Sequence, residues 1–301
     1  VYKRQLLKVC DHAGLSSMIG SLAVVLNIAL NAVFIFGLVG MPAMGIAGAA
    51  LATVCARIFE TIAVIIVVTK YKCPKLGNML VIKDRQMHKD YWKYTTPLLV
   101  NQIGWGGGVT MYSVIMGHMG SDATAANSIA SIVRTIIASL CWGISAGVSI
   151  IIGQTLGQNK LEEAKKMGGK FVRLSIWIGA ASGLVILLLI PLVLRVITLT
   201  PQAMYYLKFM LCMAAYYIIG NSLNSTIISG IFPAGGDTKF GMICDVVTLW
   251  CFVVPLGMLA AFVWHAPVLL VAFILTLDEF VKIPAVYIHY VKYKWVKNIT
   301  R

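Results

Sequence analysis

Seven ionisable side chains lie inside long apolar stretches of the sequence, where charged groups are rare. They are Arg57, Glu60, Arg134, Asp245, Asp278, Glu279 and Lys282. A charge at the centre of a lipid bilayer costs about 2.5–3.5 kcal/mol on insertion scales, so each of these groups needs a partner or a function. Arg57 and Glu60 are spaced to share one face of a helix, and we expect them to form an ion pair. Asp278 and Lys282 also share a face, in the favourable order with the acid first.

These pairs leave one carboxylate without a fixed counter-charge, because Arg134 can reach only one acid on a neighbouring helix. A buried acid without a partner is a candidate site for a proton or a Na⁺ ion. We assign this role first to Glu279, which a helical step of about 100° separates from Asp278. The alternative candidates are Asp278, Asp245 and Glu60. The other interpretation is that all these charges are structural pairs that fix the register of the helices.

Polar and aromatic side chains at similar depth could line a wet cleft between helices. These candidates are Asn101, Gln102, Trp105, Tyr112, Asn127, Tyr216, Asn221 and Asn224. Trp105 and Tyr112 offer aromatic faces to a cationic ligand. Each of the eight could instead make one structural hydrogen bond or pack in the core. The glycine-rich run from Gly104 to Gly108 allows either a flexible cleft-lining helix or close helix packing.

The composition requires lipid as the solvent. The chain has 301 residues, of which 59% are hydrophobic and 12% are charged, and its mean hydropathy is +0.85. No soluble core could bury so many apolar side chains, so we predict a membrane protein. The net charge of +14 could indicate nucleic-acid binding, but the basic residues lie in short stretches between apolar runs, as in loops that face anionic lipid. We therefore predict a lipid bilayer and no nucleic acid as partner.

The cysteines and histidines show no pattern that indicates chemistry. The seven cysteines lack a CxxC spacing and fit buried small hydrophobes. The five histidines are scattered, without a metal-binding or hydrolytic motif such as HExxH. We expect no metal site, no cofactor and no enzymatic activity.

The elements that position the charged and polar residues are membrane helices. A helix needs about 20 apolar residues to span the bilayer. The sequence contains eight such runs, at residues 17–37, 45–69, 95–117, 123–153, 170–194, 203–231, 239–263 and 267–291. Most basic residues lie in alternate loops, which the positive-inside rule assigns to the cytoplasm. We predict an all-α, multi-pass protein of the inner (plasma) membrane, with both ends of this chain cytoplasmic.

The first two predicted spans resemble the last two. In each pair the second helix carries a charged cluster and ends in a basic tail, Lys70-Tyr71-Lys72 or Lys292-Tyr293-Lys294. Internal repeats of this kind are common in transporters. We predict that residues 1–69 are the last two helices of an N-terminal lobe, residues 70–93 a cytoplasmic connector, and residues 94–301 a complete six-helix C-terminal lobe. Four helices would then be absent, which predicts a parent chain of roughly 445 residues.

Four short motifs carry a family resemblance. The first is Gly40-Met-Pro-Ala-Met-Gly-Ile-Ala-Gly-Ala-Ala-Leu-Ala-Thr53, and the second runs from Met119-Gly120 to Ala125-Ala126-Asn127. The third is Gly153-Gln-Thr-Leu-Gly-Gln158 followed by Glu162 to Ala164, and the fourth runs from Gly230 to Gly235-Gly236-Asp237-Thr238. In this order, across residues 15–295, the sequence resembles the multidrug and toxic compound extrusion (MATE) transporters.

The resemblance implies helices five to twelve of a twelve-helix protein with two lobes and a central cleft. It implies a cation-coupled antiporter, using H⁺ or Na⁺, that exports organic cations or drugs by alternating access, and we expect a monomer. The first helix, where the family often keeps a coupling acid, would be absent. Many relatives also carry a Glu soon after the proline that opens the seventh helix. Here Pro97 is followed by Asn101 and Gln102, and a glutamine cannot carry a proton.

Two other functions are compatible with the sequence. A lipid-linked oligosaccharide flippase of the same superfamily would need a more cationic cleft for its phosphates, whereas Arg134 is the one deep arginine of the predicted C-terminal lobe. A membrane receptor or scaffold would need neither the repeat nor the mid-helix charges. The antiporter is the function that we predict.

Overall fold

The computed structural model describes residues 13–40, 42–71 and 85–297. The chain divides into two compact units, Val1–Asp84 and Arg85–Arg301, and each unit is described by itself. The described residues form helices and the short turns between them, with no strand among them. The all-α architecture predicted from the sequence is confirmed for this part of the chain.

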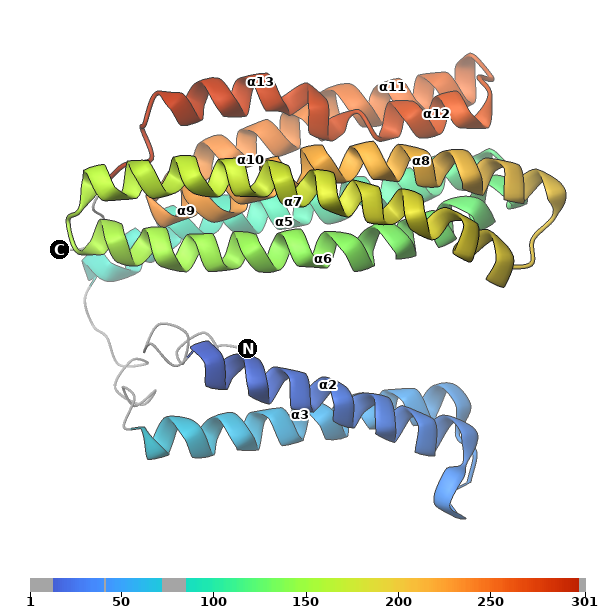
Figure 1. Cartoon of the computed structure of the whole chain (residues 1–301), viewed down its shortest axis with the longest axis horizontal. Helices are drawn as coiled ribbons and strands as arrows, with labels where there is room; N and C mark the ends of the chain where they lie inside the picture. Colours follow the sequence, from blue (N-terminus) through green and yellow to red (C-terminus); the bar gives the residue numbers. More distant parts are fainter. Residues whose placement is uncertain (1–12, 41, 72–84, 298–301) are drawn as a thin grey trace. The chain divides into compact units, whose positions relative to one another are not determined.

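The first unit contains a hairpin of two helices, α2 (Ala13–Phe36) and α3 (Gly45–Lys70) (Figure 1). The Met44 N–H donates to the Phe34 carbonyl oxygen at 2.9 Å. Gly48 lies directly against the same group, because a Cβ added to it would be 2.5 Å from the Phe34 oxygen. The small residue therefore lets the two helices approach closely near their turn.

The second unit is a bundle of helices that run side by side (Figure 1). It begins with α5 (Arg85–His118), α6 (Ser121–Gly157), α7 (Leu161–Val196) and α8 (Pro201–Asn224). A π-helical stretch, Ser225–Ile231, continues α8 into the short α9 (Phe232–Ala234). The next span contains α10 (Thr238–Val247), α11 (Val254–Met258) and π-helical stretches at Thr248–Val253 and Leu259–Val263. The last two helices are α12 (Val268–Leu275) and α13 (Asp278–Val291).

Helix α8 lies at the centre of this bundle. It packs against α6, α7, α12 and α13, whereas α10 packs against α5 and α13. Side chains from α5, α8, α10 and α13 can therefore meet inside the unit.

Six of the described helical segments are long and apolar enough to cross a membrane. They are Gly14–Phe36, Gly45–Lys70, Ser121–Gly157, Leu161–Val196, Pro201–Ala234 and Thr238–Val263. The other two predicted spans are also helical, but they differ in character. Residues 95–117 belong to α5, where Asn101, Gln102 and the glycines lower the hydropathy. The predicted span 267–291 is not one continuous helix, because it is interrupted between α12 and α13. Helix α5 begins at Arg85, so that part of the predicted connector 70–93 is helical, while residues 72–84 lie outside the described residues.

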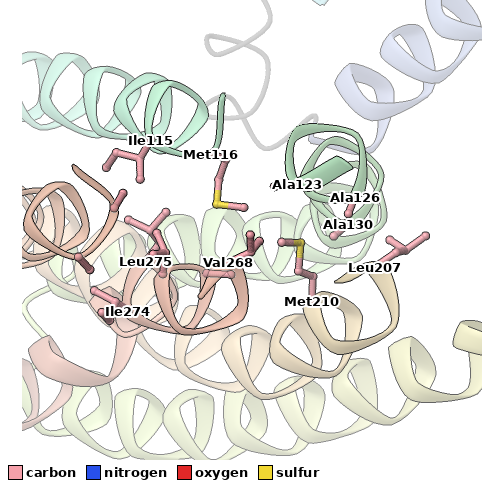
Figure 2. Close-up of a cluster of buried hydrophobic side chains, with 14 of the residues drawn as sticks. Ile115, Met116, Ala123, Ala126, Ala130, Leu207, Met210, Val268, Ile274 and Leu275 are labelled. Atoms are coloured by element: carbon pink, nitrogen blue, oxygen red, sulfur yellow. The ribbon is translucent and has the colours of Figure 1, made fainter. Parts of the chain in front are cut away.

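Clusters of buried apolar side chains pack the helices of the second unit together. One cluster joins α5, α6, α8 and α12, with Ile115, Met116, Ala126, Leu207 and Leu275 among its buried side chains (Figure 2). Another joins α6, α7, α13 and the stretch around α9.

After α13 the chain turns back and buries Trp295, whose exposed fraction is 0%. The indole ring stacks on Tyr290, with ring centroids 5.8 Å apart, and its N–H donates to the Tyr290 carbonyl oxygen. The backbone of Trp295 rests on Gly235, where an added Cβ would be 1.6 Å from the Trp295 carbonyl oxygen. The residues after α13 therefore cover the turn between α9 and α10.

Close contact between α7 and α8 depends on the small residues that face each other. A Cβ added to Gly183 of α7 would lie 2.6 Å from the Ala215 carbonyl oxygen of α8, whereas nothing lies within 4 Å of one added to Gly169. Dispersion and hydrogen bonding hold membrane helices together, so any separation of the backbones weakens the contact.

We predict that Gly183→Ala lowers the free energy of unfolding by about 1–3 kcal/mol, because the new methyl group forces the two backbones apart. The matched control is Gly169→Ala in the same helix, which should raise it by up to about 1 kcal/mol through helix propensity. Unfolding followed by circular dichroism in detergent micelles measures both. Equal effects of the two substitutions would contradict this packing.

Candidate functional site

Lys282 is held between two carboxylates inside the second unit. Its Nζ lies 2.9 Å from Asp245 Oδ1 and 3.0 Å from Glu279 Oε2. Asp245 belongs to α10, whereas Glu279 and Lys282 lie on successive turns of α13. The other Asp245 oxygen, Oδ2, accepts a hydrogen bond from Asn101 Nδ2 of α5 at 3.0 Å. Because buried charges are tolerated only when they are paired and hydrogen-bonded, this ion triad and Asn101 together tie three helices to one another.

Glu279 receives further hydrogen bonds from α8. Asn221 Nδ2 donates to its Oε1 at 3.0 Å, and Asn224 Nδ2 donates to its Oε2 at 2.8 Å. The Tyr217 hydroxyl donates to Oε1 at 3.3 Å. Together with Lys282 and Asn101, these groups place a donor on every carboxylate oxygen of the triad, which stabilises a carboxylate in its charged form.

The break between α12 and α13 positions the acids. The Thr276 hydroxyl closes the end of α12 by donating to the Phe273 carbonyl oxygen at 2.8 Å, and it also bonds the Tyr216 hydroxyl. Helix α13 then starts at Asp278, so both acids occupy its first turn. Free backbone N–H groups and the helix dipole favour negative charge there.

The predicted ion pair between Asp278 and Lys282 is wrong. Lys282 pairs with Glu279 instead, three residues before it, because that face of α13 meets Asp245 of α10 and one ammonium can then bridge two acids. Asp278 is 5% exposed and its Oδ1 has no hydrogen-bond partner. It makes no ion pair with any residue that the structure describes. Asp278, rather than Glu279, is therefore the buried acid without a counter-charge.

Charged and polar groups on four helices surround Asp278. It interacts electrostatically with Glu279 and Lys282 of its own helix, and also with Arg134 of α6, Tyr112 of α5 and Tyr217 of α8. The Arg134 guanidinium lies over the Tyr217 ring, 5.0 Å from its centroid, a cation–π contact. The Tyr112 hydroxyl is buried without a hydrogen-bond partner. The sequence predicted an ion pair for Arg134, and the structure shows a ring contact.

A cavity of about 370 Å³ opens beside the ion triad. Its lining residues are Asn101, Gln102, Trp105, Trp142, Ser145, Ala146, Asn221, Asn224, Ser225, Ile228, Ser229, Asp245, Glu279 and Lys282. The rings of Trp105 and Trp142 meet edge to face, with centroids 6.2 Å apart. We call this space the triad cavity; it combines charged groups, amides and aromatic surface.

Five of the eight predicted cleft residues line the triad cavity: Asn101, Gln102, Trp105, Asn221 and Asn224. Tyr112 and Asn127 line a second cavity of about 80 Å³, together with Arg134. Tyr216 lines neither cavity and bonds Thr276 instead. The eight candidates therefore lie in three places in the bundle.

Four further residues that line the triad cavity were not predicted from the sequence: Trp142, Ser145, Ser225 and Ser229. The two last serines follow Asn221 at steps of four residues, so a polar stripe along this helix face was a signal that could have identified them. Ser145 donates to the Ser225 carbonyl oxygen at 2.5 Å. Trp142 gives no such signal, because a tryptophan fits a lipid-facing position of a membrane helix equally well.

The first unit contains the predicted ion pair of Arg57 and Glu60, with Nη1 and Oε2 2.6 Å apart. These two residues line a cavity of about 80 Å³ in that unit, with Asn27 and Thr53. Arg57 is largely exposed and Glu60 is mostly buried.

The glycine-rich run of α5 is a packing surface. A Cβ added to Gly108 would lie 2.0 Å from Leu249 Cδ2, and Trp250 Nε1 donates to the Gly104 carbonyl oxygen at 3.0 Å. The close-packing interpretation therefore applies to these two glycines. The short distance between the helices also lets Asn101 reach the acid of α10.

A bundle of membrane-length helices around a charged, polar cavity is typical of membrane transporters. The comparison with protein families agrees. The sequence model of the MatE family matches residues 97–259, more than half of the chain. The chain belongs to the MatE family.

Relatives of known sequence are named as a transporter or as multidrug resistance proteins. The chain is 27% identical over 239 residues to the uncharacterized transporter YisQ of Bacillus subtilis, covering 78% of this chain and 52% of that protein. It is 25% identical over 232 residues to the probable multidrug resistance protein NorM of Thermotoga maritima, covering 77% of this chain and 50% of that protein. The chain spans about half the length of these curated relatives.

Solved structures share the fold. A mutant of the MATE transporter VcmN of Vibrio cholerae matches with a TM-score of 0.84 and 16% identity, over 97% of this chain and 65% of that chain. The MATE transporter ClbM in complex with Rb⁺ matches with a TM-score of 0.75 and 16% identity, over 95% and 64% of the two chains. At this level of identity the likeness is one of fold.

We predict that Glu279→Gln lowers the free energy of unfolding by about 3–5 kcal/mol, because it removes one of the two acids that hold a buried ammonium. The matched control is Glu162→Gln, since Glu162 also pairs with a lysine three residues on, Lys165, but at the surface. That change should cost less than about 1 kcal/mol. Unfolding in micelles measures both variants, and similar losses would show that the triad is not a buried network.

Proposed function

We propose that this chain is part of a cation-coupled antiporter, using H⁺ or Na⁺, that exports organic cations or drugs by alternating access. Residues 94–301 would form its C-terminal lobe, and residues 1–69 would contribute two helices of the N-terminal lobe, joined by 70–93. The protein would lie in the inner (plasma) membrane as a monomer, with its basic loops in the cytoplasm. The observation that carries the proposal is the excess of negative charge in the triad cavity.

Two carboxylates and one ammonium line that cavity, so it holds one negative charge more than it balances. Trp105 and Trp142 add aromatic faces, which attract cations. A volume of about 370 Å³ lies within the usual range for small-molecule sites, about 300–1,000 Å³. Each property favours an organic cation as the substrate.

A lipid-linked oligosaccharide flippase is the second candidate. Its phosphates would need unpaired cations, as protein sites for phosphate use Arg and Lys. Lys282 is the one basic residue that lines the triad cavity, and both of its partners are acids. A receptor or scaffold would not need a polar cavity at membrane depth. The antiporter therefore fits the described residues better than either alternative.

We further propose Asp278 as the acid that takes up the coupling ion in this lobe. Glu279 and Asp245 already have a donor on each oxygen, whereas Asp278 Oδ1 is free. A proton can bind there without displacing another group. Glu60, paired with Arg57 in the other unit, is the candidate outside this lobe.

We predict that the chain in micelles binds benzylammonium and not phenylmethanesulfonate, an anion of similar size, because the cavity is negative. Asp245→Asn should weaken benzylammonium binding about tenfold, a change of 1.4 kcal/mol. Isothermal titration calorimetry measures both ligands. The control is Asp122→Asn, because Asp122 lines neither cavity and should leave binding unchanged. Equal affinity for the two ligands would refute the substrate class.

We predict that benzylammonium affinity rises with pH, because loss of the proton from Asp278 adds a negative charge to the lobe. Asp278→Asn cannot titrate, so it should flatten this dependence. The same calorimetry at several pH values measures it. Asp122→Asn should keep the wild-type slope, and an unchanged slope in Asp278→Asn would return the coupling role to Glu279 or to the other unit.

A further inference from the structure

The triad cavity has a single negative charge in excess. Among the described residues that line it, only Asp245, Glu279 and Lys282 carry a formal charge, and the amide and hydroxyl side chains around them are neutral. The Lys282 ammonium is shared by both acids, 2.9 Å from Asp245 Oδ1 and 3.0 Å from Glu279 Oε2. One ammonium balances one carboxylate, so the lining as a whole can neutralise one further positive charge.

The charged groups just outside the cavity do not enlarge this excess. Arg134 and Asp278 interact electrostatically and carry opposite charges, and neither of them lines the triad cavity. Uptake of a proton by Asp278 would make the region less negative. The excess therefore stays at one negative charge or falls below it, whichever form Asp278 takes.

Asp245 is the acid that a ligand in the cavity can approach. Its side chain is 15% exposed, against 3% for Glu279. Each Asp245 oxygen has one donor, from Lys282 or from Asn101, and a carboxylate oxygen can accept a further hydrogen bond. A ligand cation can therefore lie against Asp245 while Lys282 keeps its place.

A second positive charge on the same ligand finds no acid left in this cavity. With one ligand cation at Asp245 and Lys282 in place, the charges of the lining residues sum to zero. The second cation would lie among amides, serines and indole rings, near two other positive charges. Removing it from water without a counter-charge is costly, and the repulsion between like charges is stronger there than in bulk water.

We propose that the triad cavity selects organic cations that carry a single positive charge, and that the neutral side chain of Gln102 sets this limit. This inference rests on the proposed function, because it takes the triad cavity as the site of an organic cation. Gln102 lines the cavity and is exposed, so a carboxylate of the same shape at this position would be ionised and would raise the excess to two charges.

Calorimetry with two matched probes tests the charge limit. The monocation is meta-(hydroxymethyl)benzylammonium, and the dication is meta-(ammoniomethyl)benzylammonium, which has the same ring and nearly the same size. The monocation should bind the wild-type chain about tenfold more tightly. Equal affinities, or tighter binding of the dication, would overturn the proposal while leaving the cavity as an organic-cation site. If neither probe binds, the proposed function itself fails.

Gln102→Glu tests the residue that sets the limit. The added carboxylate gives the second ammonium a counter-charge, so the affinity of the dication relative to the monocation should rise at least about tenfold. The matched control is Gln202→Glu, because Gln202 is exposed in the first turn of α8 and lines neither cavity of this unit. This control should keep the wild-type ratio. An unchanged ratio in Gln102→Glu, with a wild-type circular dichroism spectrum, would refute the role of Gln102.

Ser229→Asp keeps the proposal testable if Gln102→Glu does not fold. Ser229 also lines the triad cavity and is exposed, but it belongs to the π-helical stretch after α8. An acid there raises the excess to two charges from a different helix, so it should shift the ratio of the two affinities in the same direction. A folded Ser229→Asp variant with the wild-type ratio would show that the net charge of the cavity does not select the substrate.

Discussion

One ammonium group shared by two carboxylates constrains the second unit more than any other interaction. Moving Lys282, Asp245 and Glu279 away from water has a large desolvation cost, which is offset only if every charge finds a partner at hydrogen-bond distance. That requirement determines which face α13 turns toward α10 and α8. It also explains why asparagines surround the triad, because their amide N–H groups can donate to a carboxylate. The cavity is polar because the groups that pair with these charges also line it.

Close helix packing makes the ion triad possible. Lipid gives helices no hydrophobic reason to associate, so contacts depend on backbones that approach closely. Gly183 lets α7 press against α8, and Gly104 and Gly108 let α5 press against the α10 span. The close approach of α5 brings Asn101 within reach of α10, and the close approach of α7 holds α8 at the centre. The pairing of the buried charges therefore depends on the small residues.

Hydropathy and the positions of polar residues were sufficient to predict the helices and eight of the cavity residues, because a bilayer imposes apolar length on every span and makes polar residues conspicuous. The eight are the five cleft candidates and the three charged residues of the triad. These patterns could not predict the partner of Lys282. The spacing rule favours Asp278, four residues before it, on an uninterrupted helix. Both residues lie within α13 (Asp278–Val291), so the helix itself permits that pair. The choice of Glu279 depends on where α10 and α8 lie, which is tertiary information. Trp142 was missed for the same reason, since its role depends on the rotation of α6.

The late position of α13 has a consequence for biosynthesis. Asp245 precedes Lys282 by 37 residues, so at about 5–20 residues per second the acid is made about 2–7 s before its counter-ion. During that interval the nascent bundle contains an acid and several amides that no charged group satisfies. Entry of α13 removes this penalty in one step and allows Trp295 to cover the turn after α9. An incomplete chain would keep the polar groups unpaired, and this gives the quality-control machinery of the membrane a direct chemical means to tell a finished bundle from an unfinished one.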